Sequence, residues 1–331
     1  MEGDVADGTT ESLERPGAVH RLEFDVPWPP GHVAAYLIDG PEPILVDAAV
    51  HGDGAESTLR SELADAGFAL EDVEHVLITH PHSDHIGQTP ALHEAGAAIH
   101  SPEPVLEQLR RDEDELVAGV EEVGRSVGYE GNDLEKAVEQ ARYSLQRNRM
   151  LLDPAVANGL AVEDEFTVGE RTFEPIYTPG HQINHYCFET TIGGERLLFS
   201  GDVLIESFRA GIFHVGIDYG AYDAVDAFYA AMDTLEGRTA DRVYPGHGPV
   251  FDDFDGTVTM TQGKLDKLVN RTEEALAAVE PATPLAVAEE RFGEIEYPAP
   301  LLDTMGALGW LDQEGMAEYT SDNGVRYYER T

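Results

Sequence analysis

Thr79-His80-Pro81-His82-Ser83-Asp84-His85-Ile86-Gly87 contains three histidines and an aspartate within six residues. The apolar, β-branched run at 73–78 before it predicts a buried strand, and the proline and glycine within it predict a turn. The polar side chains therefore lie where a strand gives way to a loop, the usual place for ligands held by a rigid scaffold. A histidine-rich surface turn is the alternative, but this composition makes the pattern rare by chance. The spacing predicts ligands for two metal ions: His80 and His82 for one, Asp84 and His85 for the other.

The pattern of a strand followed by a candidate ligand recurs three times later in the chain. Glycine and proline stand beside these ligands and let the backbone turn tightly there. The sequence therefore predicts that several strand ends contribute to one site. The expected strands and the ligands after them are 172–177 with His181, 196–200 with Asp202, and 242–244 with His247.

The single cysteine, Cys187, excludes an internal disulfide and a site built from thiolates. A metal must then use imidazole and carboxylate ligands, which suit zinc, iron or manganese. No stretch reaches the roughly 20 apolar residues of a membrane span, and the N-terminus lacks a signal pattern. We therefore expect a cytoplasmic protein without a membrane partner.

The charge balance is extreme, with 64 acidic and 21 basic residues among 331 and a net charge of -43. Self-repulsion at this charge destabilises a compact state in dilute buffer, and molar salt shortens the Debye length to about 3 Å. We therefore predict a salt-adapted protein from a halophile, specifically a haloarchaeon, with an ordinary acidic enzyme as the alternative. Acidity normally argues against nucleic-acid partners, but in a salt-adapted protein this argument is weak.

The chain divides into three predicted parts. Residues 1–17 are acidic and lack periodicity, which predicts disorder. Strand and helix patterns alternate over 18–256, including an expected strand at 161–168, and a charged helical insertion is expected at about 104–158. Residues 257–331 read as helices followed by a hairpin, which predicts a small winged-helix-like module.

The insertion carries three arginines in a chain that is otherwise short of cations. Ion pairs on the helix surface would explain them, and so would an anion clamp that holds the substrate. The three residues are Arg142, Arg147 and Arg149.

In their order along the chain, the motifs T-H-P-H-S-D-H-I-G, T-P-G-H, S-G-D and P-G-H-G resemble those of the metallo-β-lactamase-fold hydrolases. The resemblance covers residues of about 20–255. It implies an α/β (α+β) fold, an αββα sandwich with the metal site at one edge between the two sheets. It also implies two bound divalent ions. We expect these to be Zn²⁺, with Fe or Mn as the alternatives.

The resemblance assigns each motif residue a place around these ions. The run His181-Gln182-Ile183-Asn184-His185 stands where the family has H-T-x-G-H, without the glycine. The implied ligands are His80, His82 and His181 for the first ion, Asp84, His85 and His247 for the second, and Asp202 as the bridge. Asp47 and His185 are expected to orient these ligands through hydrogen bonds without binding an ion.

The chemistry of such a pair agrees with hydrolysis. Two ions about 3.5–4 Å apart share a water, lower its pKa towards about 7 and clamp the attacking and leaving oxygens. We therefore predict a dinuclear hydrolase of a small ester-like substrate: a thioester, a lactone or another acyl compound. It resembles glyoxalase II-like and lactonase-like members, and Asp84 is the ligand expected to act in catalysis. No G-x-S-x-G motif offers a serine nucleophile.

Two other functions stay open at this stage. Some β-lactamase-like endoribonucleases carry a C-terminal winged-helix-like module, although the tail of this chain has few cations. Iron-dependent persulfide dioxygenases use the same motifs with one metal, which the presence of His247 disfavours. A homodimer also stays open. The aromatic residues at 208–219, after the bridging aspartate, either face the substrate or form a local loop core.

Overall fold

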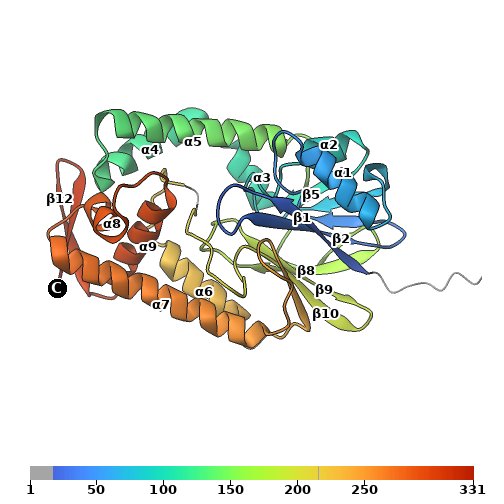
Figure 1. Cartoon of the computed structure of the whole chain (residues 1–331). Helices are drawn as coiled ribbons and strands as arrows, with labels where there is room; N and C mark the ends of the chain where they lie inside the picture. The colour runs from blue at the N-terminus through green and yellow to red at the C-terminus, as the bar shows by residue number, and fades with distance from the viewer. Residues whose placement is uncertain (1–17, 215) are drawn as a thin grey trace, which may run out of the picture.

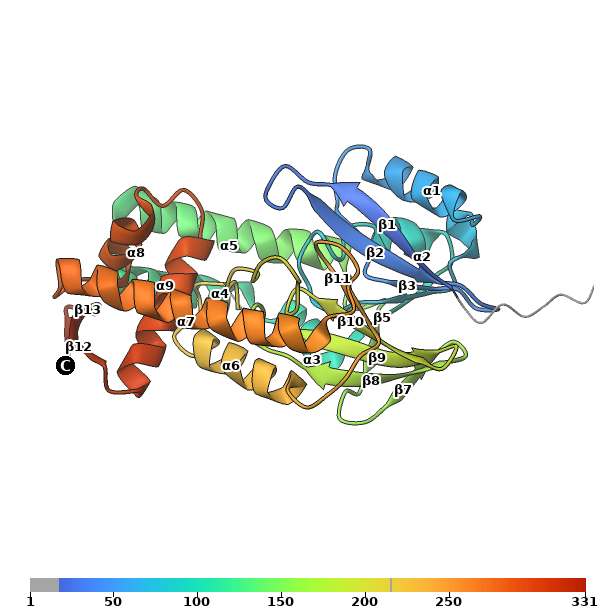
Figure 2. The ribbon, with the colours of Figure 1, turned by 60° about the horizontal axis from the view of Figure 1, so that its bottom comes forward.

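Two β-sheets face each other, and helices cover the outer side of each sheet (Figures 1 and 2). The computed structural model describes residues 18–214 and 216–331, so the disorder expected for residues 1–17 lies outside the described residues. The expected sandwich with a helical insertion is confirmed. Within the described ranges, no helix combines the length and apolarity that crossing a membrane requires.

The first sheet has six strands in sequence order. β1, β2 and β3 pair antiparallel, whereas β3, β4, β5 and β6 pair in parallel. Parallel pairing sends their carboxyl ends to one edge. The strands are β1 (Val19–Asp25), β2 (His32–Ile38), β3 (Ile44–Val46), β4 (His75–Leu77), β5 (Ala98–Pro102) and β6 (Asn158–Leu160).

The second sheet has the order β11-β10-β9-β8-β7, with β10 and β11 parallel and the other pairs antiparallel. The single strand expected at 161–168 is wrong. β6 and β7 belong to different sheets, and the acidic segment 163–165 lies where the chain crosses between them. The strands are β7 (Phe166–Val168), β8 (Arg171–Tyr177), β9 (Tyr186–Ile192), β10 (Glu195–Gly201) and β11 (Arg242–Pro245).

Three apolar layers hold the sandwich together. Aromatic and aliphatic side chains from both sheets, such as Tyr36, Leu77 and Phe199, fill the space between the sheets. The outer face of the first sheet packs against α1 (Ala55–Asp65), α2 (Thr89–Glu94) and α3 (Glu103–Arg110). The outer face of the second sheet packs against α6 (Ala224–Leu235) and α7 (Phe254–Val279).

The insertion consists of α3 and a pair of antiparallel helices, α4 (Glu113–Val127) and α5 (Gly131–Leu151). Gly128 ends α4 with φ 106°, a left-handed conformation that glycine adopts without strain. Gly124 lies inside α4. A Cβ there would stand 2.5 Å from Leu134, so the residue allows α4 and α5 to pack closely.

The C-terminal elements pack beside the second sheet and touch the insertion. α7 is followed by α8 (Pro284–Phe292), α9 (Ala299–Gln313) and a hairpin of β12 (Ala317–Asp322) and β13 (Val325–Arg330). A bridge joins Ala282 to Tyr328, so a short extended segment between α7 and α8 lies along the hairpin. α4 contacts β13, and both views show α5 extending from the sheets towards these elements (Figures 1 and 2).

Candidate metal centre

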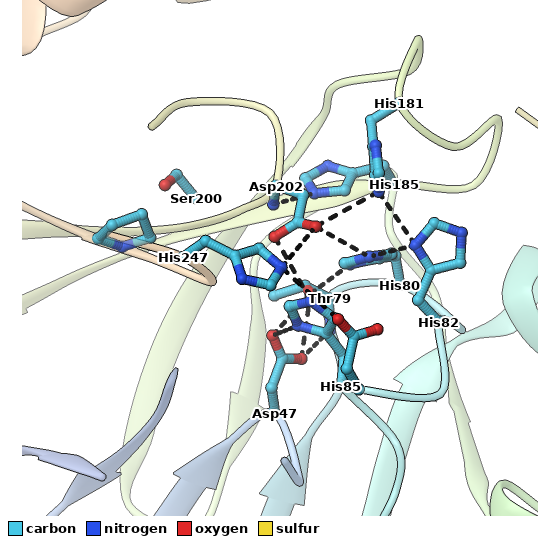
Figure 3. Close-up of polar contacts among 12 residues, drawn as sticks. Asp47, Thr79, His80, His82, His85, His181, His185, Ser200, Asp202 and His247 are labelled. Atoms are coloured by element: carbon cyan, nitrogen blue, oxygen red, sulfur yellow. Dashed lines mark hydrogen bonds and ion pairs between the residues drawn. The ribbon is translucent and has the colours of Figure 1, made fainter. Parts of the chain in front are cut away.

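The edge of the sandwich gathers the ends of strands from both sheets. Asp47 follows β3 and His80 follows β4, and these strands pair in parallel. Asp202 follows β10 and His247 follows β11, which form the parallel pair of the second sheet. Figure 3 shows these side chains converging, together with His181 from the loop after β8.

The first group of side chains consists of His80, His82, His181 and Asp202. Nε2 of His80 and Nε2 of His181 lie 3.1 Å and 3.0 Å from Nδ1 of His82. Oδ2 of Asp202 lies 3.4 Å from Nε2 of His181 and 4.0 Å from Nε2 of His80. Three imidazoles and one carboxylate therefore point their ligand atoms at one small volume.

The second group consists of Asp84, His85 and His247. Nε2 of His247 lies 3.6 Å from Oδ2 of Asp84. Asp202 reaches this group as well, with Oδ1 3.4 Å from Nε2 of His85 and Oδ2 3.3 Å from Nε2 of His247. Asp202 thus lies between the two groups, in the position that a bridging ligand needs.

The residues present fit a pair of divalent cations. Ligands about 2.0–2.1 Å from a tetrahedral zinc ion lie about 3.3 Å from one another, which agrees with the spacings above. Nε2 of His85 and Oδ1 of Asp202 are buried and have no hydrogen-bond partner among the described residues. Such orphaned polar atoms are costly unless something binds them, and both face the second group.

The outer nitrogen of each histidine in the two groups also has a partner. This arrangement fixes the ring and leaves the inward nitrogen free to bind a cation. The pairs are His80 Nδ1 with Thr79 Oγ1 at 2.9 Å, His82 Nε2 with the carboxamide of Gln182, His85 Nδ1 with Asp47 Oδ2 at 2.8 Å, His181 Nδ1 with the Gly211 carbonyl at 2.6 Å, and His247 Nδ1 with the His32 carbonyl at 2.6 Å.

Asp47 is the centre of the support under the first loop. Its carboxylate accepts from Nδ1 of His85, from the backbone N–H of Thr79 at 2.9 Å and from the Thr79 hydroxyl at 2.9 Å. Asp47 has a φ of 59°, a left-handed conformation that is uncommon outside glycine but tolerated by aspartate and asparagine. The backbone is held there because the carboxylate must face the loop.

His185 lies behind Asp202 and belongs to neither group of candidate ligands. The backbone N–H of Asp202 donates to Nε2 of His185 at 3.1 Å. Nδ1 then carries the hydrogen and donates to the Thr178 hydroxyl at 2.8 Å. Burial, with the nearby His181, lowers the pKa of His185 to about 3 and keeps the ring neutral.

The electrostatics of the groups favour cation binding. Burial and the neighbouring His85 hold the pKa of His80 well below its usual range. Burial would also lower the pKa of His85, but the carboxylates of Asp202 and Asp47 outweigh it and raise the value. Burial would raise the pKa of Asp202, yet His247 and His85 hold it well below normal. A charged carboxylate thus lies among imidazoles, and a divalent cation would compensate this buried arrangement.

Two glycines allow this close packing. A Cβ on Gly246 would lie 2.4 Å from Oδ1 of Asp202 and 2.5 Å from Cε1 of His85. A Cβ on Gly201 would lie 2.5 Å from Nε2 of His185, and its φ of 48° is left-handed. Any side chain at either position would push a ligand or its support out of place.

Sequence reasoning missed the support that Gln182 and Phe213 give to the first group. Gln182 is buried against His82, and the Phe213 ring lies 5.3 Å from the His82 ring and 5.8 Å from that of His181. The backbone N–H of Phe213 also donates to the His181 carbonyl at 2.9 Å. The position of Gln182 between the two histidines of its motif was the available signal.

The three arginines of the insertion have different surroundings. Arg142 pairs with Glu113 at 2.8 Å, so the surface ion pair is the correct reading there. Nε of Arg149 donates to the Leu109 carbonyl at 2.6 Å and joins α5 to the end of α3. Arg147 has no ion-pair partner in the described part of the chain, and Asn148, next to it, donates to the Pro81 carbonyl at 2.8 Å.

Comparison with known proteins identifies a family over most of the chain. The family model described as the Metallo-beta-lactamase superfamily matches residues 28–249, which include both groups of side chains. The probable metallo-hydrolase YqjP of Bacillus subtilis is 24% identical over 323 residues, 92% of this chain and 96% of that protein.

Two further relatives differ in how much of their length is shared. An atrochrysone carboxyl ACP thioesterase of Cryptosporiopsis is 23% identical over 241 residues, 73% of this chain, which spans only 55% of that relative. The crystal structure of a metallo-beta-lactamase family protein from Thermus thermophilus has a TM-score of 0.76 and 23% identity, covering 95% of this chain and 98% of that one. This likeness shows a common fold that extends over the insertion and the C-terminal elements.

Proposed function

Because this chain belongs to the metallo-β-lactamase superfamily, we propose that it is a dinuclear metal-dependent hydrolase of small acyl compounds. One observation carries the proposal. Seven ligand side chains fall into two groups that share Asp202, and they contain imidazole and carboxylate but no thiolate. That donor set suits zinc, with iron or manganese as the other candidates.

When bound, two such ions would supply an ionised water and polarise the acyl oxygen. Asp202 keeps its negative charge between the groups, because neighbouring histidines hold its pKa well below normal. Asp84 is the more exposed of the two carboxylates, with 14% of its side chain accessible against 5% for Asp202. We assign it the role of orienting the attacking water and accepting its proton.

The proposed substrate class agrees with the reaction and is supported by one relative. Water activated at such a centre attacks an electrophilic carbon or phosphorus, and the acyl carbons of thioesters and lactones are electrophiles of this kind. The similarity to a protein named as a thioesterase agrees with this class. The presence of His247 in a complete second group favours this reading over a persulfide dioxygenase with one iron.

We also propose that the C-terminal part of the chain forms a module of the enzyme. The helix order α7, α8, α9, the bridge at Ala282 and the hairpin β12–β13 support a winged-helix-like C-terminal module at 257–331. Its apolar side chains share one core with α6 and the second sheet, so it would act as part of the enzyme.

The acidic composition supports a haloarchaeal origin, and a cytoplasmic location and a homodimer stay predictions.

The test is elemental analysis of the purified protein in molar salt, followed by a panel of thioesters, lactones and RNA. We expect two divalent ions per chain, predominantly zinc, and hydrolysis of at least one acyl substrate. One iron per chain without zinc would support the dioxygenase, and cleavage of RNA alone would support the endoribonuclease. A protein that binds no divalent ion would overturn the proposal.

A further inference from the structure

Helix α5 lies directly against the loop that carries the ligands. Nδ2 of Asn148 donates to the carbonyl of Pro81 at 2.8 Å, and Pro81 stands between His80 and His82. The last turns of α5 are therefore held beside the metal centre by a specific hydrogen bond. A side chain that projects from this part of the helix can reach a molecule bound at the ions.

The loop is open to solvent at the residues that follow Pro81. His82, Ser83 and Asp84 are partly exposed, whereas His80 and His85 are buried. The centre is thus accessible from solvent along this partly exposed edge. Asn148 fixes α5 next to the same edge.

Arg147 lies in this region, next to Asn148 on α5. Its Nε donates to Oδ1 of Asn148 at 3.1 Å, and its guanidinium carbon lies 5.6 Å from the centroid of the Tyr143 ring. The two terminal nitrogens have no hydrogen-bond or ion-pair partner among the described residues. The side chain is half-buried, and burial lowers its pKa although Tyr143 and the charge of Asp84 act in the opposite direction.

Two other arginines of the insertion pair with carboxylates, whereas Arg149 donates to backbone carbonyls. Arg111 pairs with Asp218 at 2.6 Å, and Arg142, about one and a half turns before Arg147 on the same helix, pairs with Glu113 at 2.8 Å. In a chain with a net charge of -43, carboxylates are plentiful. The terminal nitrogens of Arg147, in contrast, contact neither a carboxylate nor a carbonyl among the described residues.

Building on the proposed acyl hydrolase, we propose that Arg147 binds an anionic group of the substrate, a carboxylate or a phosphate. The planar guanidinium fork matches both anions, and Tyr143 and Asn148 limit its movement before the substrate arrives. The acyl group would lie at the ions while the anion lies on α5. The substrate class narrows accordingly to acyl compounds that carry a negative charge away from the bond that is cleaved.

The test compares matched esters in the metal-loaded protein at one salt concentration. The probes are mono-4-nitrophenyl adipate, its methyl ester, and the analogue with a phosphonate in place of the free carboxylate. We expect Arg147→Met to lower kcat/KM for the better anionic ester about 10- to 100-fold, and to lower it far less for the methyl ester. For Arg147→Lys, kcat/KM for the anionic ester should lie between the wild-type value and that of Arg147→Met. The control Arg142→Met should keep the wild-type ratio of kcat/KM for the anionic ester to that for the methyl ester. The two anionic arms distinguish a carboxylate from a phosphate.

Binding provides a readout that does not depend on turnover. Calorimetric titration of adipate into the metal-loaded protein should show binding to the wild type. In Arg147→Met the affinity for adipate should fall by the same factor as kcat/KM for the anionic ester. If no ester is cleaved but adipate binding depends on Arg147, the acyl hydrolase fails and the anion site stands. An equal loss for charged and neutral esters, together with lost metal, would mean that Arg147 only supports Asp84, and the inference would be wrong.

Discussion

The hydrogen bond between Asp47 and His85 allows a sharp test of how the second group is organised. Replacing Asp47 with asparagine keeps the shape of the side chain and its tolerance of the left-handed φ of 59°. The amide oxygen can still accept from the Thr79 backbone, which donates to Oδ1 at 2.9 Å. Its NH₂ group then faces Nδ1 of His85, where the carboxylate accepts at 2.8 Å. Two donors now oppose each other.

The imidazole of His85 can relieve this conflict only by moving its hydrogen to the other nitrogen. Nε2, which faces Asp202 at 3.4 Å, would then carry the hydrogen and could not bind a cation. A hydrogen bond to a charged group contributes about 1.5–3 kcal/mol, which corresponds to an affinity loss of about 10- to 100-fold. In the first group His80 depends on Asp47 only through the Thr79 hydroxyl, which lies 3.0 Å from Oδ1 and can still donate to the amide oxygen. We therefore expect the larger loss at the second ion.

The assay is competition for Zn²⁺ between the metal-free protein and a chromophoric chelator, which resolves two binding steps. Asp39→Asn is the matched control, because Asp39 accepts from His20 at 3.5 Å on a different part of the first sheet. Unchanged affinity in both steps for Asp47→Asn would refute the reasoning. An equal loss in both steps would show that Asp47 stabilises the loop as a whole instead of selecting the His85 tautomer.

Three further predictions concern metal, salt and pH. Asp202→Ala should lose both ions and all turnover, because Asp202 contacts both groups; elemental analysis that finds two retained ions would contradict its bridging role. The thermal unfolding midpoint, followed by circular dichroism, should fall steeply between molar salt and about 0.1 M, where the Debye length is about 10 Å; a salt-independent midpoint would contradict the halophilic origin. Burial and the nearby His75 lower the pKa of His100 to about 4, so its folded form resists protonation. The free energy of unfolding should therefore fall as pH drops from about 6.5 towards 4, by about 1 kcal/mol at pH 5 after allowing for solvent screening. His100→Gln should remove this part of the pH dependence of the free energy of unfolding, measured by urea denaturation. An unchanged pH dependence in the variant would contradict the role assigned to His100.

The convergence of the candidate ligands could be predicted from the sequence because their signal is local. His80 and its neighbours stand directly after an apolar strand, and Asp202 and His247 follow strands whose glycines mark tight turns. Local patterns also located the helical insertion within a few residues of its ends. A motif of this kind specifies both the residue types and the backbone that holds them.

The remaining features depend on contacts between distant segments, which leave no local pattern. The run at 161–168 begins and ends with apolar residues and is predicted as one strand, but the chain crosses between the sheets there. The sequence alone does not show which of the three arginines in the insertion forms an ion pair. That Arg142 does so follows from the position of Glu113 in the folded chain. The common core of the C-terminal helices and α6 likewise emerges only in three dimensions.

Each group of ligands takes residues from both halves of the sandwich. His80, His82, Asp84 and His85 come from the first sheet, and His181, Asp202 and His247 come from the second. A cut in the crossing segment at 161–165 would thus leave two fragments, neither of which holds a complete site. If divalent cations bind at both groups as proposed, reassembly of the fragments would depend on them, and the ions would act as cross-links between the halves of the protein.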